Sequence, residues 1–241
     1  MINPKIIFED EYLLVIDKPA GLVVHPNEKR EPKETVVSWF IRRSPEIKRF
    51  DWPEPWRPGI VHRLDKDTSG VLILAKSPQI LEELQKQWQT KEVEKTYLAL
   101  VFGEVKQNGI INLNILRHKN RKKQTVSALK LSTQEKEAKT YYYILRHIKT
   151  KKANLTLLKV KPQSGRTHQI RVHLKAAGYP IIGDQTYGTK PSRRLNKEWG
   201  ILRQFLHATA LKIQHPKTKK IKIFQAPLPA FLKNFLQKII D

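Results

Sequence analysis

The sequence predicts an α+β fold built on a large, mostly antiparallel mixed β-sheet flanked by helices and loops. Many short apolar or alternating segments predict strands, and only a few amphipathic segments predict helices. The strict alternation of strand and helix that is typical of a parallel sheet is absent. The 241 residues show no convincing internal boundary, so we expect one domain over residues 1–241.

The first part of the chain, up to about Phe102, predicts several short strands and two helices. The expected elements are two strands around an acidic turn in IIFEDEYLLVIDKP, a short helix at 35–43, a buried strand at 71–75, a helix over 78–90 and a strand ending near Phe102. The helix over 78–90 is expected because Leu81, Leu84 and Trp88 recur on one helical face.

The second part contains the most basic stretch, residues 104–136, which we interpret as an insertion holding a hairpin or long loop. Beyond it, KTYYYILRHI and ANLTLLKVKPQ predict a strand pair. HQIRVHLKAAGY predicts a helix that Gly178 caps and Pro180 ends. FLHATALKI and KIKIFQAP predict two further strands, and LPAFLKNFLQKII predicts a closing helix.

Charge is the strongest compositional signal. Lys and Arg number 46 against 22 Asp and Glu, which gives a net charge of +24 and a pI near 10.1. Such an excess favours a polyanionic partner, and nucleic acid is the first candidate. An anionic membrane surface is the second, but no basic amphipathic helix supports it. The alternative is a solvated, Lys-rich surface, and charge alone does not separate RNA from DNA.

Several classes of protein are excluded by composition. The absence of Cys excludes disulfide scaffolds, thiolate zinc sites, iron–sulfur clusters and Cys nucleophiles. No apolar run reaches the length of a transmembrane helix, and acidic residues interrupt any signal-peptide pattern at the start. We therefore expect a cytoplasmic protein with no membrane association.

The densest group of reactive side chains is HRLDKDTSG, residues 62–70, directly before an apolar strand. Asp65 and Asp67 could bind a divalent metal as in nucleases, form an acid–base pair, or supply one carboxylate as nucleophile or electrostatic partner. The structural alternative is a salt-bridged turn, because Asp67, Thr68 and Ser69 are ordinary turn residues.

A second group is KPQSGRTHQIRVH, residues 161–173, where a Gly-flanked turn and two Arg at a helix start suit a phosphate. His168 and His173 lie five residues apart, a poor spacing for one metal ion. The structural alternative is a basic amphipathic helix with a solvated face.

Tyr97 is expected on the same strand face as Ala99 and Val101. It is either an ordinary core residue or a side chain that stacks on a flipped base.

These blocks resemble RNA pseudouridine synthases of the RluA/RluD type. The resemblance rests on RPGIVHRLDKDTSGVLILAKS, KTYLALVFGEV and SGRTHQIRVHLKAAGYPIIGDQTYG, with DEYLLVIDKPAGLVVHP before them and LHATALKIQHP and FQAPLP after them. It spans the chain from about Ile6 to Phe231, and the rRNA-modifying RluD type is most similar. Many such enzymes carry a small RNA-binding domain ahead of the catalytic one. Here the first strand begins within ten residues of Met1, so we expect that domain to be absent. The resemblance therefore does not identify which RNA or which uridine is modified.

The resemblance implies a pseudouridine synthase fold and isomerisation of uridine to pseudouridine in structured RNA, ribosomal or transfer, with no cofactor or metal. It implies that Asp65 is the essential carboxylate, that Tyr97 stacks on the base, and that Arg171 pairs with Asp65. A neighbouring guanidinium would keep a buried carboxylate ionised. We expect a monomer.

The resemblance and the basic charge of the chain together predict which residues contact RNA. Arg63 resembles the residue that fills the space of the flipped base, and Asp67 is expected to cap the turn. The predicted RNA contacts are His62, Arg63, Arg117, Arg121, Lys122, Arg166, His168 and Gln169, with Lys119 and Lys123 on the same basic loop. Two alternatives remain, a non-catalytic RNA-binding or ribosome-assembly factor and a metal-dependent nuclease using Asp65 and Asp67.

Overall fold

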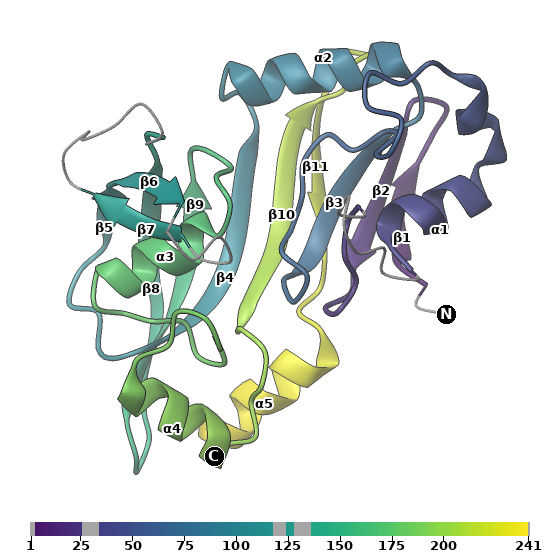
Figure 1. The fold of residues 1–241 in the computed structure, drawn as a ribbon. Helices are drawn as coiled ribbons and strands as arrows, with labels where there is room; N and C mark the ends of the chain where they lie inside the picture. The colour runs from purple at the N-terminus through teal and green to yellow at the C-terminus, as the bar shows by residue number, and fades with distance from the viewer. Residues whose placement is uncertain (1–2, 26–33, 118–123, 128–135, 241) are drawn as a thin grey trace. The chain divides into compact units, whose positions relative to one another are not determined.

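The structure is a computed structural model that describes residues 3–25, 34–117, 124–127 and 136–240 (Figure 1). It divides into two compact units. The first unit comprises residues 1–94 and 208–227, and the second comprises residues 95–207 and 228–241. Both units combine antiparallel strands with helices, which confirms the predicted α+β class. That the chain acts as one catalytic domain stays a prediction.

The first unit is built on a sheet whose strands come from both ends of the chain. Its strand order is β1 (Lys5–Glu9), β2 (Leu13–Lys18), β3 (Ser69–Ala75) and β10 (Leu206–Gln214), with β11 (Ile221–Gln225) also paired to β10. The pairs β1–β2, β2–β3 and β10–β11 are antiparallel. The carboxylate of Asp10 accepts hydrogen bonds from the backbone of Tyr12 and Leu13, which fixes the predicted acidic turn.

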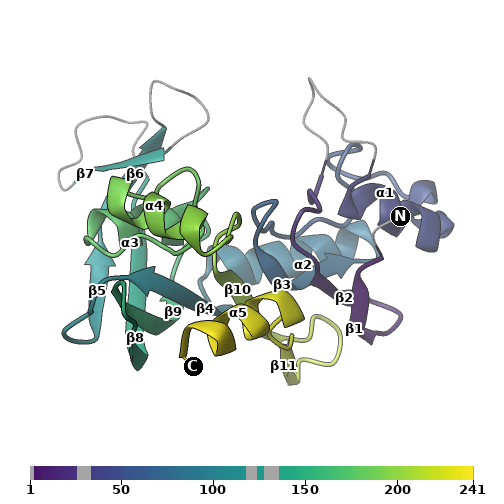
Figure 2. The same cartoon turned by 90° about the horizontal axis from the view of Figure 1, so that it is seen from below.

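Helices α1 (Val36–Arg43) and α2 (Pro78–Gln89) and the 3₁₀ helix η1 (Pro45–Arg49) complete this unit. Thr35 forms a capping box with Ser38, and Ser77 caps α2. On the predicted face of α2, Leu81 and Leu84 are buried and Trp88 is half-buried, and the helix packs on β3 (Figures 1 and 2). Every residue of β3 is buried, which gives the loop before it a rigid support.

The second unit has a sheet with strand order β4 (Glu94–Phe102), β9 (Asn154–Pro162), β8 (Lys139–Lys149) and β5 (Gly109–Asn112). Strands β6 (Asn114–Arg117) and β7 (Gln124–Ser127) form a separate hairpin. The predicted insertion therefore contains one strand of the main sheet and a hairpin. Residues 118–123 and 128–135 of that stretch lie outside the described part of the chain.

Three helices accompany this sheet, α3 (Gln169–Ala176), α4 (Lys190–Glu198) and α5 (Ala230–Ile240). Gly178 follows α3 with φ +88°, which confirms the predicted cap. Residues 169–174 are all buried, so the alternative of a solvated amphipathic helix is wrong, because α3 packs against β7, β8 and β9. Helix α4 was not predicted, although Thr189 and Ser192 form a capping box before it.

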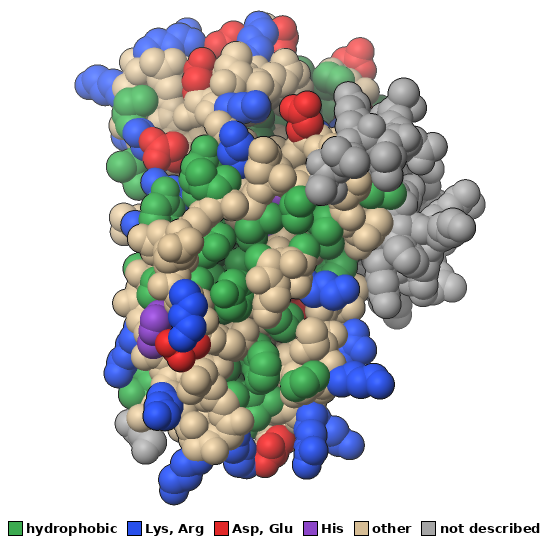
Figure 3. Space-filling model, turned by 90° about the vertical axis from the view of Figure 1, so that its left-hand side faces the viewer, with side chains coloured by type: hydrophobic (Ala, Val, Ile, Leu, Met, Phe, Trp, Pro, Cys, Tyr) green, Lys and Arg blue, Asp and Glu red, His purple; other side chains and the backbone are tan. Residues whose placement is uncertain are grey.

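The surface agrees with the charge of the sequence. On the face drawn in Figure 3, basic side chains predominate over acidic ones and surround a region of hydrophobic side chains. Within the described ranges, no helix combines the length and the apolar character that crossing a membrane would require.

Candidate active site

The loop that carries Asp65 closes a hairpin in the first unit. The amide of Ala75 at the end of β3 donates to the carbonyl of Gly59 at 2.9 Å, and Ile60 forms a bridge with Leu74. Gly59 has φ +71°, and a Cβ there would collide with the backbone of Ala75, so only glycine suits this close approach. The intervening residues 61–68 are thereby held at the start of β3.

A buried lysine fixes the far side of this loop. Lys18, at the end of β2, is fully buried, and its Nζ donates to the carbonyls of Pro19 (2.8 Å), Leu22 (2.9 Å) and Lys66 (3.0 Å). The amide of Gly21 donates to the same Lys66 carbonyl at 2.9 Å. Charge-assisted hydrogen bonds of this kind are stronger than neutral ones, so the backbone beside Asp65 is firmly placed.

Asp65 opens a turn, because the amide of Thr68 donates to its carbonyl at 3.1 Å. Its side chain is half-buried, as is that of Asp67, while Thr68 and Ser69 are buried. The loop thus presents two partly accessible carboxylates on a rigid backbone. No three His, Asp or Glu side chains gather into a metal-binding group in the described ranges.

Two predicted RNA contacts, His62 and Arg63, precede Asp65 in the same loop. The ring of His62 stacks on Trp88 with centroids 5.0 Å apart, and its Nε2 accepts the amide hydrogen of Ile73 at 3.2 Å. The side chain of Arg63 is exposed and lies 3.5 Å from the Nε2 of His25. His62 is therefore held against the unit, whereas Arg63 reaches the solvent.

In the second unit, Arg171 forms a buried, bidentate ion pair with Asp184. The Nε of Arg171 donates to Oδ2 at 2.7 Å and its Nη2 to Oδ1 at 2.9 Å. The guanidinium also lies 5.1 Å from the ring centroid of Tyr187. This geometry fixes the plane of the guanidinium. The expected pairing of Arg171 with Asp65 stays a prediction.

Asp184 is a functional candidate that sequence reasoning missed. Its Oδ1 also accepts the backbone hydrogens of Thr186 (2.8 Å) and Tyr187 (3.0 Å). Burial alone would raise the pKa of Asp184, but hydrogen bonds and charge from Arg171 outweigh burial and hold that pKa below its usual value. The signal was present in the GDQTYG segment of the third block, where an Asp precedes a Gly-ended turn.

The turn before α3 is held by Gln169. Its Oε1 accepts from Ser164 Oγ (2.7 Å) and from the Arg166 amide (3.1 Å), and its Nε2 donates to the Lys139 carbonyl and Thr140 Oγ1. Gln169 is buried, so it acts as a support in this structure. The predicted contact of Gln169 with RNA stays a prediction. Arg166, in contrast, has an exposed side chain.

His168 lies at the start of α3 with φ +56°, and its Nδ1 is 2.9 Å from the hydroxyl of Tyr187. The same hydroxyl accepts the amide hydrogen of Gln124 at 2.8 Å. Tyr187 therefore connects His168 with the ion pair of Arg171. A non-glycine residue with positive φ is uncommon and concentrates at functional positions.

Tyr97 lies on β4 opposite Val160 and is half-buried. Lys95 is two residues earlier and therefore on the same strand face. Its side chain is buried, and its Nζ donates to the Ser164 carbonyl at 3.2 Å. Burial lowers the pKa of Lys95 to about 8. Lys95 was not predicted as a site residue, although it stands beside Tyr97 in EKTYLA.

The remaining predicted contacts fall in the basic stretch. Arg117 is the last residue of β6, whose backbone pairs it with Gln124. Arg121 and Lys122, with Lys119 and Lys123, lie outside the described residues. Within the second unit the structure brings Arg166, His168, Gln169 and Arg171 onto one turn and helix.

Comparison with known proteins decides the family. The family model for RNA pseudouridylate synthase matches residues 12–176. The chain belongs to the RNA pseudouridylate synthase family. It is 38% identical over 98% of its length to ribosomal large subunit pseudouridine synthase D of Nitrosomonas europaea, covering 65% of that protein. It is 36% identical over 99% of its length to ribosomal large subunit pseudouridine synthase C of Haemophilus influenzae, covering 69%.

The chain thus spans about two thirds of the length of these curated pseudouridylate synthases. The solved structure of human RNA pseudouridylate synthase domain containing 4 superimposes with a TM-score of 0.74 at 23% identity. The alignment covers 98% of this chain and 92% of the human one. This similarity confirms the pseudouridine synthase fold that the sequence predicted.

The buried imidazole of His173 predicts a pH-dependent stability. Its Nε2 donates to the Leu113 carbonyl at 3.1 Å, and its Nδ1 lies 2.9 Å from Thr140 Oγ1. Burial lowers the pKa of His173 to about 4, against a smaller opposing effect of the Leu113 carbonyl.

Between pH 6.5 and about 4 the unfolded state therefore binds a proton that the folded state does not. The free energy of unfolding should fall as pH falls through this window, by about 2–3 kcal/mol. Urea unfolding at about pH 7 and about pH 4.5 measures this, with His173→Gln as the control that lacks the titrating group. Equal pH dependence in the two proteins would contradict the assignment.

Proposed function

We propose that this protein isomerises uridine to pseudouridine in RNA, with ribosomal RNA of the large subunit as the substrate. The observation that carries the proposal is the family match over residues 12–176, which includes Asp65, Tyr97 and Arg171. The relatives named above act on the large ribosomal subunit by name. The net charge of +24 favours a polyanionic substrate of this kind.

In the proposed reaction the bond between ribose C1′ and uracil N1 breaks, the base turns, and C1′ bonds to C5. The C5 hydrogen leaves as a proton, and N1 gains one, so atoms balance without a redox partner. A uridine stacked in a helix does not expose its glycosidic bond, and flipping it out costs a few kcal/mol. Positive charge that develops on the sugar is stabilised by a nearby carboxylate.

Asp65 is the residue that we assign to this carboxylate, as nucleophile or as proton acceptor. The loop that holds it is fixed by Lys18 and by Gly59, which supports a preorganised role. Arg171 is assigned to keep Asp65 ionised. Its own orientation by Asp184 supports that assignment, because a fixed guanidinium loses little freedom on binding an anion.

The test of this function is direct. Purified protein is incubated with a large-subunit ribosomal RNA transcript and with a tRNA transcript, and pseudouridines are mapped by carbodiimide and reverse transcription. We expect new stops on the ribosomal transcript, unchanged by an excess of EDTA because no metal takes part. Strand cleavage that EDTA abolishes would favour the nuclease, and binding without modification would favour the assembly factor.

Two variants of Tyr97 distinguish a role in base stacking from a role in proton transfer. Tyr97→Phe retains an aromatic face and should bind RNA like wild type while turning over more slowly. Tyr97→Leu lacks that face and should raise the Kd by roughly fivefold or more, because stacking on one base contributes about 1–3 kcal/mol. Filter binding and single-turnover rates measure the two effects, and equal affinity of the variants would contradict the stacking role.

A further inference from the structure

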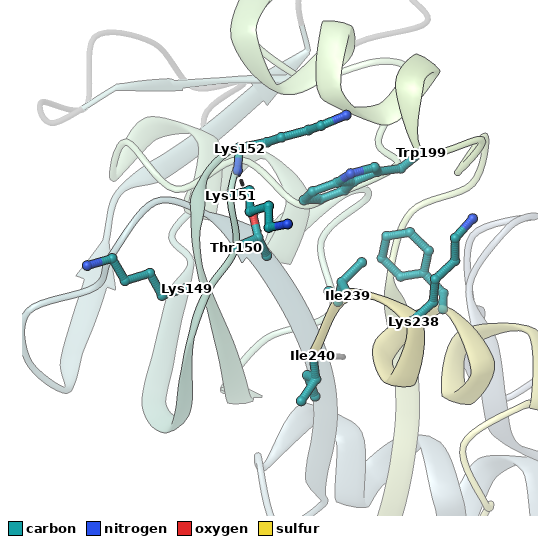
Figure 4. Close-up of a pocket in the computed structure, with 9 residues that line it drawn as sticks. Lys149, Thr150, Lys151, Lys152, Trp199, Lys238, Ile239 and Ile240 are labelled. Carbon is teal, nitrogen blue, oxygen red and sulfur yellow. Dashed lines mark hydrogen bonds between the residues drawn. The ribbon is translucent and has the colours of Figure 1, made fainter.

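A cavity of about 370 Å³ lies in the second unit, at the turn between β8 and β9. The end of β8 supplies Lys149, and the turn supplies Thr150, Lys151 and Lys152. Trp199 lines the cavity from the end of α4, and α5 supplies Phe235, Lys238, Ile239 and Ile240. Figure 4 shows Trp199 projecting between the turn and α5. The volume is at the lower end of the range for small-molecule sites, about 300–1,000 Å³, which suits one nucleotide.

The indole side chain of Trp199 is held in place by its backbone and by its ring. Trp199 is the C-cap of α4, and its backbone N–H donates to the carbonyls of Leu195 and Lys197. Its ring packs on buried Phe235 with centroids 5.9 Å apart and an interplanar angle of 62°. Trp199 itself is only half-buried, so a rigid indole surface remains available to a flat ligand.

The rim of the cavity is positively charged. All four ionisable residues that line it are lysines, and only Lys152 forms an ion pair within the described ranges, with Glu198. In Figure 4 the side chains of Lys151 and Lys238 stand beside the cavity, whereas that of Lys149 points away. The turn is rigid, because Thr150 Oγ1 accepts from the amides of Lys152 and Ala153.

An indole surface bordered by lysines matches the two parts of a nucleotide, because a base stacks on the ring and phosphates meet the ammonium groups. We propose that this cavity binds one unpaired nucleotide of the substrate RNA, outside the region that reacts. The choice of RNA as the anion rests on the proposed function.

The cavity is separate from the residues assigned to catalysis in this unit. Tyr97 pairs with Val160 of β9, and the cavity begins at the turn before Asn154. About six residues of extended strand span about 20 Å. A nucleotide bound here therefore lies several positions from the target uridine, so it contributes to affinity and register without touching the reacting atoms.

The test uses the full chain and an oligoadenylate of about six residues with one internal 2-aminopurine, whose fluorescence falls when it stacks. This probe contains no uridine, so its binding is independent of pseudouridine formation. We expect quenching with wild type and with Asp65→Asn. Trp199→Leu should lose the quenching and raise the Kd by roughly fivefold or more, whereas Trp199→Phe should retain part of both.

The lysines are tested by the salt dependence of binding. Lys151→Gln with Lys238→Gln should lower the slope of log K against log salt by about 1.4, because each single-strand phosphate contact contributes about 0.7. The matched control is Lys48→Gln with Lys220→Gln, two lysines that are likewise exposed, and it should leave the slope unchanged.

Three results would overturn the proposal. These are equal slopes for the two double variants, undiminished quenching with Trp199→Leu, or displacement of the probe by a hexaglutamate peptide as efficiently as by unlabelled oligoadenylate. The third result would identify a general anion site. Failure of the enzyme to modify RNA would refute the proposed function and leave this binding result unaffected.

Discussion

Replacing Asp65 by Asn should reduce pseudouridine formation by at least about a thousandfold, the scale seen when an essential catalytic group is removed. Asn has nearly the same shape and leaves the backbone of the turn intact, where the Thr68 amide donates to the carbonyl of residue 65. Folding and RNA affinity should therefore stay at wild-type levels. Single-turnover assays with carbodiimide mapping give the rate, and filter binding gives the affinity.

Asp67→Asn is the matched control, since it changes the same charge two residues away in the same loop. An amide oxygen can still cap a turn, so we expect its rate to stay within a few-fold of wild type. If Asp65→Asn retained most of the activity, or if the two variants lost activity equally, Asp65 would not be the essential carboxylate.

The second large effect concerns the ion pair of Arg171 and Asp184. Both side chains are buried, with 7% and 0% of their side-chain surfaces exposed. Asp184→Ala removes the carboxylate that forms a bidentate pair with the buried guanidinium, and breaking such a pair costs about 3–5 kcal/mol of folding stability. It also frees the plane of the guanidinium, so activity should fall beyond what unfolding explains. Urea unfolding and assays at low temperature separate the two losses.

A double variant distinguishes a structural from a catalytic role of this pair. Arg171→Met with Asp184→Leu removes both charges and keeps similar volumes, so much of the lost stability should return. Activity should not return, because the methionine side chain lacks the guanidinium that we assign to keep Asp65 ionised. Recovery of activity together with stability would show that the ion pair only holds the fold.

Most elements of the fold could be predicted because their signals are local. The acidic turn at Asp10, the amphipathic spacing of α2 and the Gly178 cap each follow from neighbouring residues. Helix α4 was missed because its sequence, KPSRRLNKE, is almost wholly polar, with Leu195 as its one apolar residue apart from the proline at its start. Hydrophobic periodicity does not detect a helix of this kind.

The site was predicted as motifs and not as a network. Asp65, Tyr97 and Arg171 were proposed as site residues from short blocks, but the carboxylate that pairs with Arg171 is 13 residues away in another turn. Lys18 donates a hydrogen bond to the carbonyl of Lys66 in the Asp65 loop, and these two residues are 48 positions apart in the sequence. Such pairings depend on tertiary contacts, which a single sequence does not reveal. Lys95 was missed for the same reason, because its lowered pKa comes from burial in the folded chain.

The discontinuity of the first unit has a consequence for biosynthesis. Strand β3 pairs with β10, yet β10 leaves the ribosome long after β3. During that interval the buried, largely apolar β3 has one unsatisfied edge, which favours association with other nascent chains. Translation pauses or chaperone depletion should therefore harm the yield of this protein more than its equilibrium stability suggests. Truncations that end before residue 208 should accumulate as aggregates.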